Sequence, residues 1–390
     1  MIKSILDNDL YKFTMQQAVH MLYPRAEVEY RFVNRGDTPF PDGFAGRYEK
    51  AIEKLSVLIL TPDEEEYLKK TCYFMTPVYL DFLRTYRFDP KEVQVQQEGG
   101  RIELTIKGPW FRTILWEVPL MATMSELYFK LGPESAQHRE ALQKRNREKS
   151  LLLKENGVSY ADFGTRRRYS LENHERVLQD LLSVTDNTLV GTSNVYLAKK
   201  FDIRPIGTHA HEWFMYHAVE NGYRLANRSA IEAWTHVYHG HLGIALTDTF
   251  TTDAFLSTFD SVQARLFDGV RHDSGDPFEF VDKVVTHYKK MRIEPNHKTI
   301  VFSDALNPKN AVEIKKYCRG KINASFGLGT NLTNDVGPQP LNIVIKMTAC
   351  RSSADLPWHP TVKLSDAKEK NSGDPEEIAL CERMLRSLLG

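Results

Sequence analysis

Two regions of the chain differ in how hydrophobic and polar positions alternate. In the first third, AEVEYRFVNRG (26–36) alternates apolar with polar residues, as a half-buried strand does. EVQVQQEGGRIELTIKG (92–108) contains two such runs around Gly99 and Gly100, which predicts a β-hairpin. TPDEEEYLKK (61–70) predicts a helix, with a capping threonine, a proline at the first position and acidic residues in the first turn. This region therefore predicts a mixed α+β domain.

From about residue 158 the pattern changes to short apolar runs that end in small or polar residues, each followed by a helical pattern. These junctions read VSYADFGTRR, TLVGTSN, IRPIGTHAHE, GIALTDTF, DGVRHDSGD, TIVFSDALN and ASFGLGTN. Repeated strand–loop–helix units favour a parallel α/β sheet, and we predict that it forms a barrel. The loops after the strands of a barrel meet at one face. That face would gather Phe163, Arg166, Thr208, His211, Arg271, Asp273, Asp304, Gly329 and Thr330.

These patterns predict three parts of the chain. Residues 1–135 are expected to form the mixed domain, and residues 136–335 the barrel. Residues 336–390 return to strand patterns and end in a helix. We expect this last part to pack on the N-terminal domain.

Composition narrows the class of protein. The 390 residues are 42% hydrophobic and 26% charged, which suffices for a large core and more than one domain. The 51 Lys and Arg balance the 51 Asp and Glu, so no overall field attracts nucleic acid or an anionic membrane. No apolar run is long enough to span a bilayer, and MIKSILDNDLYKF lacks the apolar core of a signal peptide. The four scattered cysteines, without a CxxC pair, predict reduced thiols in the cytoplasm.

Several junctions carry residues suited to an anionic ligand. FGLGT (326–330) could bring backbone amides close to a phosphate, although glycine serves tight turns equally well. Asp304 could contact such a ligand or simply cap a helix. Arg271 suits a carboxylate or phosphate, and Asp273 suits sugar hydroxyls or the water shell of Mg²⁺. Phe163, beside three arginines, could stack on a flat ring. Together they predict a pocket for a flat anionic ring and a phosphorylated sugar.

The pair His209 and His211 in IGTHAHEW allows two interpretations. Such a pair after a barrel strand could begin the site of a metal-dependent hydrolase, with His272 and later aspartates as further ligands. Alternatively, His211 could accept a phosphoryl group as a nucleophile, with His209 incidental. The surplus of arginines and glycines favours the second interpretation. The barrel metal-dependent hydrolase is the alternative.

The motifs NDLYKFTM, FGTRR, GTSNVYLA, PIGTHAHEW, RHDSGDP, FSDAL and FGLGT, in this order, span nearly the whole chain. Together they resemble the nicotinate phosphoribosyltransferase family. The resemblance implies an irregular, TIM-like α/β barrel of the type II phosphoribosyltransferase kind, with a mixed α+β N-terminal domain completed by C-terminal strands. It also implies a homodimer with shared active sites. The implied reaction joins nicotinate and 5-phosphoribosyl 1-diphosphate in NAD salvage. It needs Mg²⁺ and ATP as co-substrate, which places the enzyme among ATP-dependent ligases.

The resemblance also implies roles for single residues on the nicotinate side of the site. Phe163 and Tyr11 would sandwich the ring, with Tyr11 supplied by the partner subunit. Arg271 and Thr208 would bind nicotinate, and Arg166 would lie near the anionic groups.

Other residues are implied to act on the phosphate side. His211 would be phosphorylated by ATP, and Asp273 would bind ribose or metal. The residues implied to bind phosphate or diphosphate are Asp304, Gly329, Thr330 and, from the partner subunit, Arg35.

Ser193 in GTSN bears on the choice of substrate. In the nicotinamide-using relative an aspartate occupies this position, where it would accept the amide and repel a carboxylate. Serine here favours the acid substrate. The quinolinate-using relative lacks the phosphorylated histidine, so PIGTHAHEW argues against it. A pure binding module is the weakest interpretation because the site residues are chemically so diverse.

Overall fold

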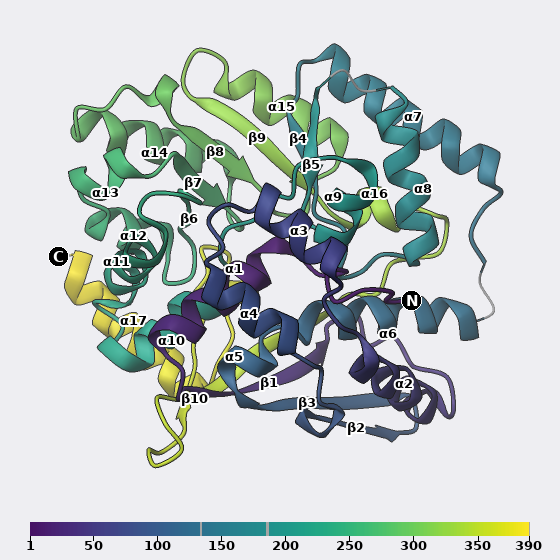
Figure 1. The fold of residues 1–390 in the computed structure, drawn as a ribbon. Helices are drawn as coiled ribbons and strands as arrows, with labels where there is room; N and C mark the ends of the chain where they lie inside the picture. Colours follow the sequence, from purple (N-terminus) through teal and green to yellow (C-terminus); the bar gives the residue numbers. More distant parts are fainter. Residues whose placement is uncertain (133–134, 185–186, 390) are drawn as a thin grey trace. The chain divides into compact units, whose positions relative to one another are not determined.

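The structure is a computed structural model that describes residues 1–132, 135–184 and 187–389. The chain divides into two compact units (Figure 1). The N-terminal unit comprises Met1–Gly207 and Leu328–Lys346, and the C-terminal unit comprises Thr208–Gly327 and Met347–Gly390. The three parts predicted from the sequence, with boundaries at residues 135 and 335, do not correspond to these two units and remain a prediction.

The N-terminal unit contains the expected antiparallel strands. They are β1 (Glu27–Asn34), β2 (Val93–Glu98) and β3 (Arg101–Pro109), and β3 pairs with both of the others. Glu98 lies opposite Arg101 across the turn at Gly99, whose φ of 54° suits glycine. The hairpin predicted at 92–108 is therefore confirmed.

Helices and two short parallel strands complete this unit. The helix predicted at 61–70 is confirmed as α3 (Pro62–Thr71). In its capping box, Glu64 N–H donates to Thr61 Oγ1 at 3.3 Å, and Thr61 N–H donates to Glu64 Oε2 at 2.9 Å. The parallel strands are β4 (Tyr160–Asp162) and β5 (Leu189–Thr192). The other helices are α1 (Leu10–Leu22), α2 (Phe44–Glu53), α4 (Pro77–Thr85), α5 (Trp110–Thr113), α6 (Glu117–Leu131), α7 (Arg139–Glu155), α8 (Leu171–Leu182), α9 (Val195–Phe201) and α16 (Thr330–Thr333).

The C-terminal unit is built on parallel strands that alternate with helices. The strands β6 (Ile244–Leu246), β7 (Gly269–His272), β8 (Thr299–Phe302) and β9 (Asn323–Leu328) pair in chain order. The helices are α10 (His211–Asn221), α11 (Ala226–Tyr238), α12 (Thr252–Thr258), α13 (Ser261–Leu266), α14 (Pro277–Lys290), α15 (Pro308–Cys318) and α17 (Pro375–Leu389). This alternation confirms the predicted α/β class with parallel strands.

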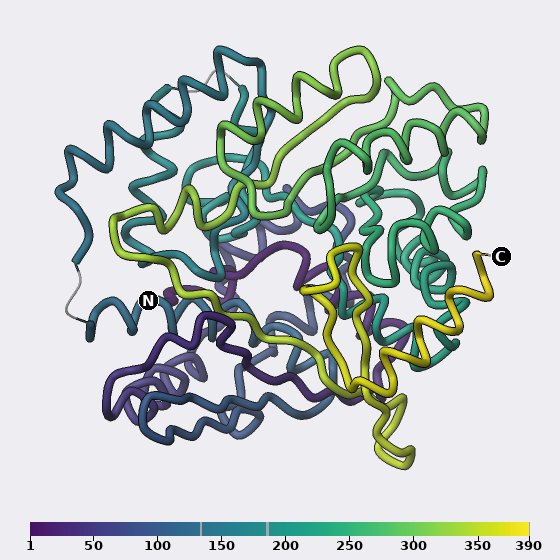
Figure 2. Tube along the Cα trace, turned by 180° about the vertical axis from the view of Figure 1, so that it is seen from behind, coloured from purple at the N-terminus to yellow at the C-terminus, as the bar shows by residue number. Residues whose placement is uncertain are grey.

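The chain from Met347 onward belongs to this unit, so the boundary between the units falls within the next strand. β10 (Ile343–Arg351) pairs antiparallel with β11 (His359–Pro360). Residues 361–372 then lie beside the loop after β6, where Leu364 N–H donates to Thr249 O at 2.8 Å and Thr251 N–H donates to Leu364 O at 2.9 Å. α17 packs against α12, and Figure 2 shows this yellow helix beside the green helices of the same unit.

Across the described ranges, every helix is too short or too polar to cross a lipid bilayer.

Candidate active site

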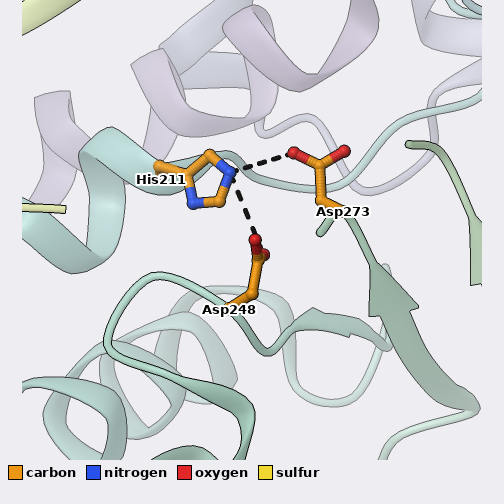
Figure 3. A group of neighbouring side chains, drawn as sticks. All are labelled: His211, Asp248 and Asp273. Carbon is orange, nitrogen blue, oxygen red and sulfur yellow. Dashed lines mark hydrogen bonds and ion pairs between the residues drawn. The ribbon is translucent and has the colours of Figure 1, made fainter. Parts of the chain in front are cut away.

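His211 is the first residue of α10 and belongs to the C-terminal unit. Its Nδ1 lies 3.0 Å from the Thr249 hydroxyl, and its Nε2 lies 3.0 Å from Asp273 Oδ2. Asp248 Oδ1 lies 4.0 Å from the same Nε2, so two carboxylates face one ring nitrogen (Figure 3). Because a carboxylate can only accept, Nε2 carries the hydrogen and the lone pair of the neutral ring is on Nδ1.

The charges around this ring oppose one another. Burial lowers the pKa of His211, and the positive charge of Lys363 lowers it further. Asp248 and Asp273 have the opposite effect, because their negative charges favour the protonated ring. Burial opposes ionisation of Asp273, but the hydrogen bond from His211 and the charge of Arg271 hold the pKa of Asp273 well below its usual range. The side chain of His211 is 20% exposed, so a ligand can reach it. A neutral imidazole that is reachable and held by a carboxylate can act as a nucleophile.

Asp248 has one carboxylate oxygen that is bound and one that is not. Ser274 Oγ donates to Oδ2 at 2.5 Å. Oδ1 is buried and has no hydrogen-bond partner among the described residues. The ligand atoms of His211, Asp248 and Asp273 lie within 4.8 Å of one another, so these residues could hold a cation.

His209 does not share this cluster. Its ring is buried against Trp234 and Phe214, and its Nε2 accepts a hydrogen bond from Leu246 N–H at 3.2 Å. His272 is also buried, between Phe280 and Phe302. The two histidines of the HxH motif therefore face different surroundings, which disfavours a metal site built on the pair.

The remaining predicted residues of this unit lie at the same strand ends. Arg271 Nη1 donates to His209 O at 3.0 Å, while its buried Nε has no partner among the described residues. Thr208 Oγ1 donates to Ile244 O at 3.0 Å. Asp304 forms an ion pair with Lys370, which also donates to Asp273 O at 3.0 Å.

In the N-terminal unit, the predicted glycine-rich segment meets the end of β4. Phe163 N–H donates to Leu328 O at 2.8 Å, and a Cβ on Gly329 would lie 3.4 Å from Phe163 O. Gly329 precedes Thr330, the first residue of α16. A Cβ on Gly164 would lie 2.3 Å from two side-chain atoms of Thr333, so this close packing requires glycine. The structure thus brings Phe163, Gly329 and Thr330 together.

A buried carboxylate organises Tyr11 and Arg166 in this unit. Glu117 Oε2 lies 2.6 Å from Lys12 Nζ, and Glu117 Oε1 accepts from Arg166 Nη1 at 3.1 Å. Although burial opposes ionisation of Glu117, Lys12 and Arg166 bring its pKa below the ordinary value. Burial raises the pKa of Tyr11, and Glu117 raises it further. Tyr11 is therefore close to Glu117 of its own chain.

Arg35 and Arg166 share their surroundings with a third arginine. The pKa of Arg167 falls to about 10, because the side chain is buried and because Arg166 and Arg35 repel its charge. Three guanidinium groups in one region form a cluster suited to anions.

Ser193 is hydrogen-bonded to an acid that is distant in sequence. Its Oγ donates to Asp9 Oδ1 at 2.7 Å, and both residues are buried. Burial raises the pKa of Asp9 above its ordinary value. Ser193, on which the prediction of an acid substrate rests, thus faces a carboxyl group.

Sequence reasoning missed Asp248, Thr249, Lys363, Glu117 and Lys12. Asp248 and Thr249 lie in the junction GIALTDTF, so a rule that takes every polar residue after a strand would have included them. Lys363, Glu117 and Lys12 carry no local signal, because their partners are distant in sequence.

Parallel strands with polar and ionisable side chains at their carboxyl ends define an α/β enzyme with its site on the strand-end loops. The nicotinate phosphoribosyltransferase (NAPRTase) family model matches residues 158–387, and the N-terminal domain model of this family matches residues 6–148. The chain belongs to the nicotinate phosphoribosyltransferase family.

Named relatives agree over nearly the full length. Nicotinate phosphoribosyltransferase of Desulforapulum autotrophicum is 60% identical over 385 residues, covering 99% of each chain. That of Chromohalobacter salexigens is 50% identical, covering 99% of this chain and 98% of the relative. The crystal structure of nicotinate phosphoribosyltransferase from Porphyromonas gingivalis has a TM-score of 0.97 at 45% identity, covering 99% of this chain and all of that one.

Proposed function

We propose that this chain joins nicotinate to 5-phosphoribosyl 1-diphosphate, giving nicotinate mononucleotide and diphosphate, and that ATP hydrolysis drives the reaction through a phosphohistidine at His211. The observation that carries the transferase activity is the family membership over nearly the whole chain. The ATP coupling, which would place the enzyme among ligases, is supported by the surroundings of His211.

In the transferase step the ring nitrogen of nicotinate attacks the anomeric carbon as diphosphate leaves. The protein then has to orient two anions and neutralise the departing one. Arg271, with a buried Nε that lacks a partner among the described residues, suits the nicotinate carboxylate. Arg35, Arg166 and Arg167 offer the charge that diphosphate requires.

In the ATP step the neutral ring of His211 is the nucleophile. Nδ1 holds the lone pair while Nε2–H donates to Asp273, so Nδ1 attacks the γ-phosphorus. The bond from that phosphorus to the bridging oxygen breaks, and ADP leaves with the electron pair. Hydrolysis of the phosphohistidine can favour product release only if the two forms of the enzyme bind ligands differently.

Mg²⁺ fits the carboxylates beside His211. Asp248 Oδ1 is buried without a hydrogen-bond partner among the described residues, and Mg²⁺ prefers oxygen ligands. Asp248 and Asp273 would hold it. The bound ion would neutralise phosphate charge.

Further features of the proposal follow from the family resemblance. We infer an irregular, TIM-like barrel, a homodimer with shared sites, and a role in NAD salvage. A cytoplasmic location is supported by the cysteines, all of which are buried and free. The hydrolase alternative is not favoured. The lone pair on Nε2 of the buried His209 accepts from Leu246 N–H, so the hydrogen of the neutral ring is on Nδ1 and neither nitrogen offers a lone pair to a metal.

The first experiment compares substrates. Product formation is measured from nicotinate and from nicotinamide, each with and without ATP. We expect product from nicotinate, stimulation by ATP with Mg²⁺, and little product from nicotinamide. Activity that depends on tightly bound zinc would instead favour the hydrolase.

The second experiment tests the phosphohistidine. γ-Labelled ATP should label the wild type, and acid should remove the label because the phosphorus–nitrogen bond is acid-labile. His211→Asn should remain unlabelled. His236→Asn, on the exposed face of α11, is the matched control and should label normally. Equal labelling of His211→Asn would exclude this residue as the acceptor.

A further inference from the structure

We propose that Lys363 and Ser365, in the C-terminal segment 361–372, are positioning residues for His211. They hold Asp248 so that its Oδ1 faces Nε2 of His211, while Nδ1 of the same ring attacks ATP. This inference rests on the proposed phosphorylation of His211. It assigns a role in that step to a segment close to the end of the chain.

Among the described residues, the two serine hydroxyls and the lysine that fix Asp248 all reach the same one of its two oxygens. Ser274 Oγ donates to Oδ2 at 2.5 Å, Ser365 Oγ lies 3.3 Å from it, and Lys363 Nζ lies 3.6 Å from it. Ser365 Oγ also lies 2.8 Å from Ser274 Oγ, which links the two hydroxyls. Oδ1 is left facing His211 Nε2 at 4.0 Å. Asp248 is 1% exposed and Lys363 is 9% exposed, so water screens this pair weakly.

The backbone of the segment is fixed against the same loop. Leu364 pairs with Thr249 and Thr251 through two hydrogen bonds. Thr249 contacts Nδ1 of His211, whereas Asp248, the residue before it, faces Nε2. Asp366 anchors the next turn, because its carboxylate accepts from Thr252 N–H at 2.8 Å and from Thr252 Oγ1 at 2.6 Å. The segment therefore contacts both Thr249, which lies beside Nδ1 of His211, and Asp248, which lies beside Nε2.

The chemistry of the ATP step explains why this matters. When Nδ1 forms its bond to the γ-phosphorus and ADP departs, the ring keeps the hydrogen on Nε2 and becomes positively charged. Asp273 and the unbound oxygen of Asp248 stabilise that charge where it develops. Without Lys363, Asp248 Oδ2 would lose the ammonium group that lies 3.6 Å from it, and the carboxylate would be free to turn away from the ring. The ring would then lose one of the groups that fix it and stabilise its charge.

The experiment measures phosphoenzyme formation from γ-labelled ATP in a rapid-mixing assay. The variants are Lys363→Met, Lys363→Arg and Ser365→Ala. Lys298→Met is the matched control, because Lys298 is also a buried lysine of this unit but donates to the carbonyls of Arg265 and Phe267. We expect Lys363→Met to lower kcat of phosphorylation at least about tenfold, with KM for ATP changed less than about threefold. Lys363→Arg should recover most of the rate, Ser365→Ala should lose a few-fold, and Lys298→Met should label like the wild type.

Other outcomes separate the two hypotheses. A wild type that takes no label contradicts the phosphohistidine itself. A labelled wild type with Lys363→Met and Ser365→Ala labelled at the same rate contradicts the positioning role alone. A rise in KM for ATP at unchanged kcat would place Lys363 on the nucleotide instead. Should Lys363→Met fail to fold by its thermal unfolding curve, Ser365→Ala decides, since it removes a single hydroxyl.

Discussion

The two units hold their buried carboxylates in opposite ways. In the N-terminal unit, Glu117 lies between Lys12 and Arg166, so its charge is fully matched. In the C-terminal unit, Asp248 and Asp273 share one histidine, and one buried oxygen has no hydrogen-bond partner within the described ranges. A matched carboxylate fixes the direction of an arginine. A carboxylate oxygen without a hydrogen-bond partner favours an arriving cation, or a positive charge that develops during reaction. The difference is in line with the roles proposed above, in which the first cluster binds and the second takes part in the chemistry.

Removing the charge of Glu117 should have the largest effect. Glu117→Gln removes the carboxylate charge that faces Lys12, whose side chain is 1% exposed, and Arg166. We expect a loss of about 3–5 kcal/mol in the free energy of unfolding, measured by urea denaturation. Glu172→Gln is the control, because its ion pair with Arg176 is exposed and should contribute within about 0.5 kcal/mol. Similar losses for both variants would mean that the N-terminal cluster does not depend on charge matching.

Arg271→Lys should separate binding from chemistry in the C-terminal cluster. A guanidinium group can bind a carboxylate through two parallel hydrogen bonds, which an ammonium group cannot reproduce. KM for nicotinate should rise at least about tenfold, with a much smaller change in KM for 5-phosphoribosyl 1-diphosphate. Steady-state kinetics with each substrate varied in turn provides the measurement. The reverse pattern would assign Arg271 to diphosphate.

The pH dependence of stability should distinguish Glu117 from Asp9. The pKa of Glu117 is lowered in the folded chain, so its contribution is complete above the unfolded value, about 4.3, and is lost as pH falls through the folded value. The pKa of Asp9 is raised, so its contribution is complete below about 3.9 and is lost as pH rises through the folded value. Each group changes the slope of the free energy of unfolding against pH by at most about 1.4 kcal/mol per pH unit.

Urea denaturation between pH 3 and pH 8 compares wild type with Glu117→Gln and Asp9→Asn. Glu117→Gln should flatten the acid side of the stability curve, and Asp9→Asn should reduce the loss of stability as pH rises. Identical curves for the two variants would show that the opposite shifts are absent.

Complementation tests the proposal that Tyr11 and Arg271 act in one active site that two chains share. Tyr11→Ala and Arg271→Ala should each be nearly inactive. In mixed dimers of a shared-site enzyme, one site carries both changes and the other carries neither, so an equal mixture should recover roughly a quarter of wild-type activity. A mixture proven to contain mixed dimers yet still inactive would mean that Tyr11 serves its own chain, where it lies close to Glu117.

The strand ends were predictable because local sequence defines them. An apolar run followed by glycine or a small polar residue marked β4 to β9, and it placed Arg271 at the end of β7 and Asp273 directly after it. The run IRPI before His211 was predicted as a strand too, but it forms only an isolated bridge between Pro205 and Thr192. Threonine, proline and three acidic residues likewise specified the start of α3. The sequence was sufficient to predict an element where all the residues that define it lie within about ten positions of one another.

Residues that act through distant partners could not be found in this way. Asp248 follows a strand, but an aspartate at that position serves as often as a helix cap. Lys12 and Glu117 each lie on a helix where a charge would ordinarily face solvent, and only the folded chain brings them within 2.6 Å. Lys363 contacts Asp248 because residues 361–372 pair with the loop after β6, and no periodicity in KLSD signals that pairing.

The buried cysteines make this enzyme convenient for fluorescence work. Cys72, Cys318, Cys350 and Cys381 are all buried, and burial raises the pKa of Cys72, Cys350 and Cys381 to about 12. Thiols that are both enclosed and protonated react slowly with maleimides. Cysteines introduced at Val57, which is 76% exposed, and at Leu389, which is 51% exposed, would therefore take up dyes without removal of the native ones. One dye would lie in each unit, so energy transfer between them would show whether ATP or nicotinate changes the distance between the units.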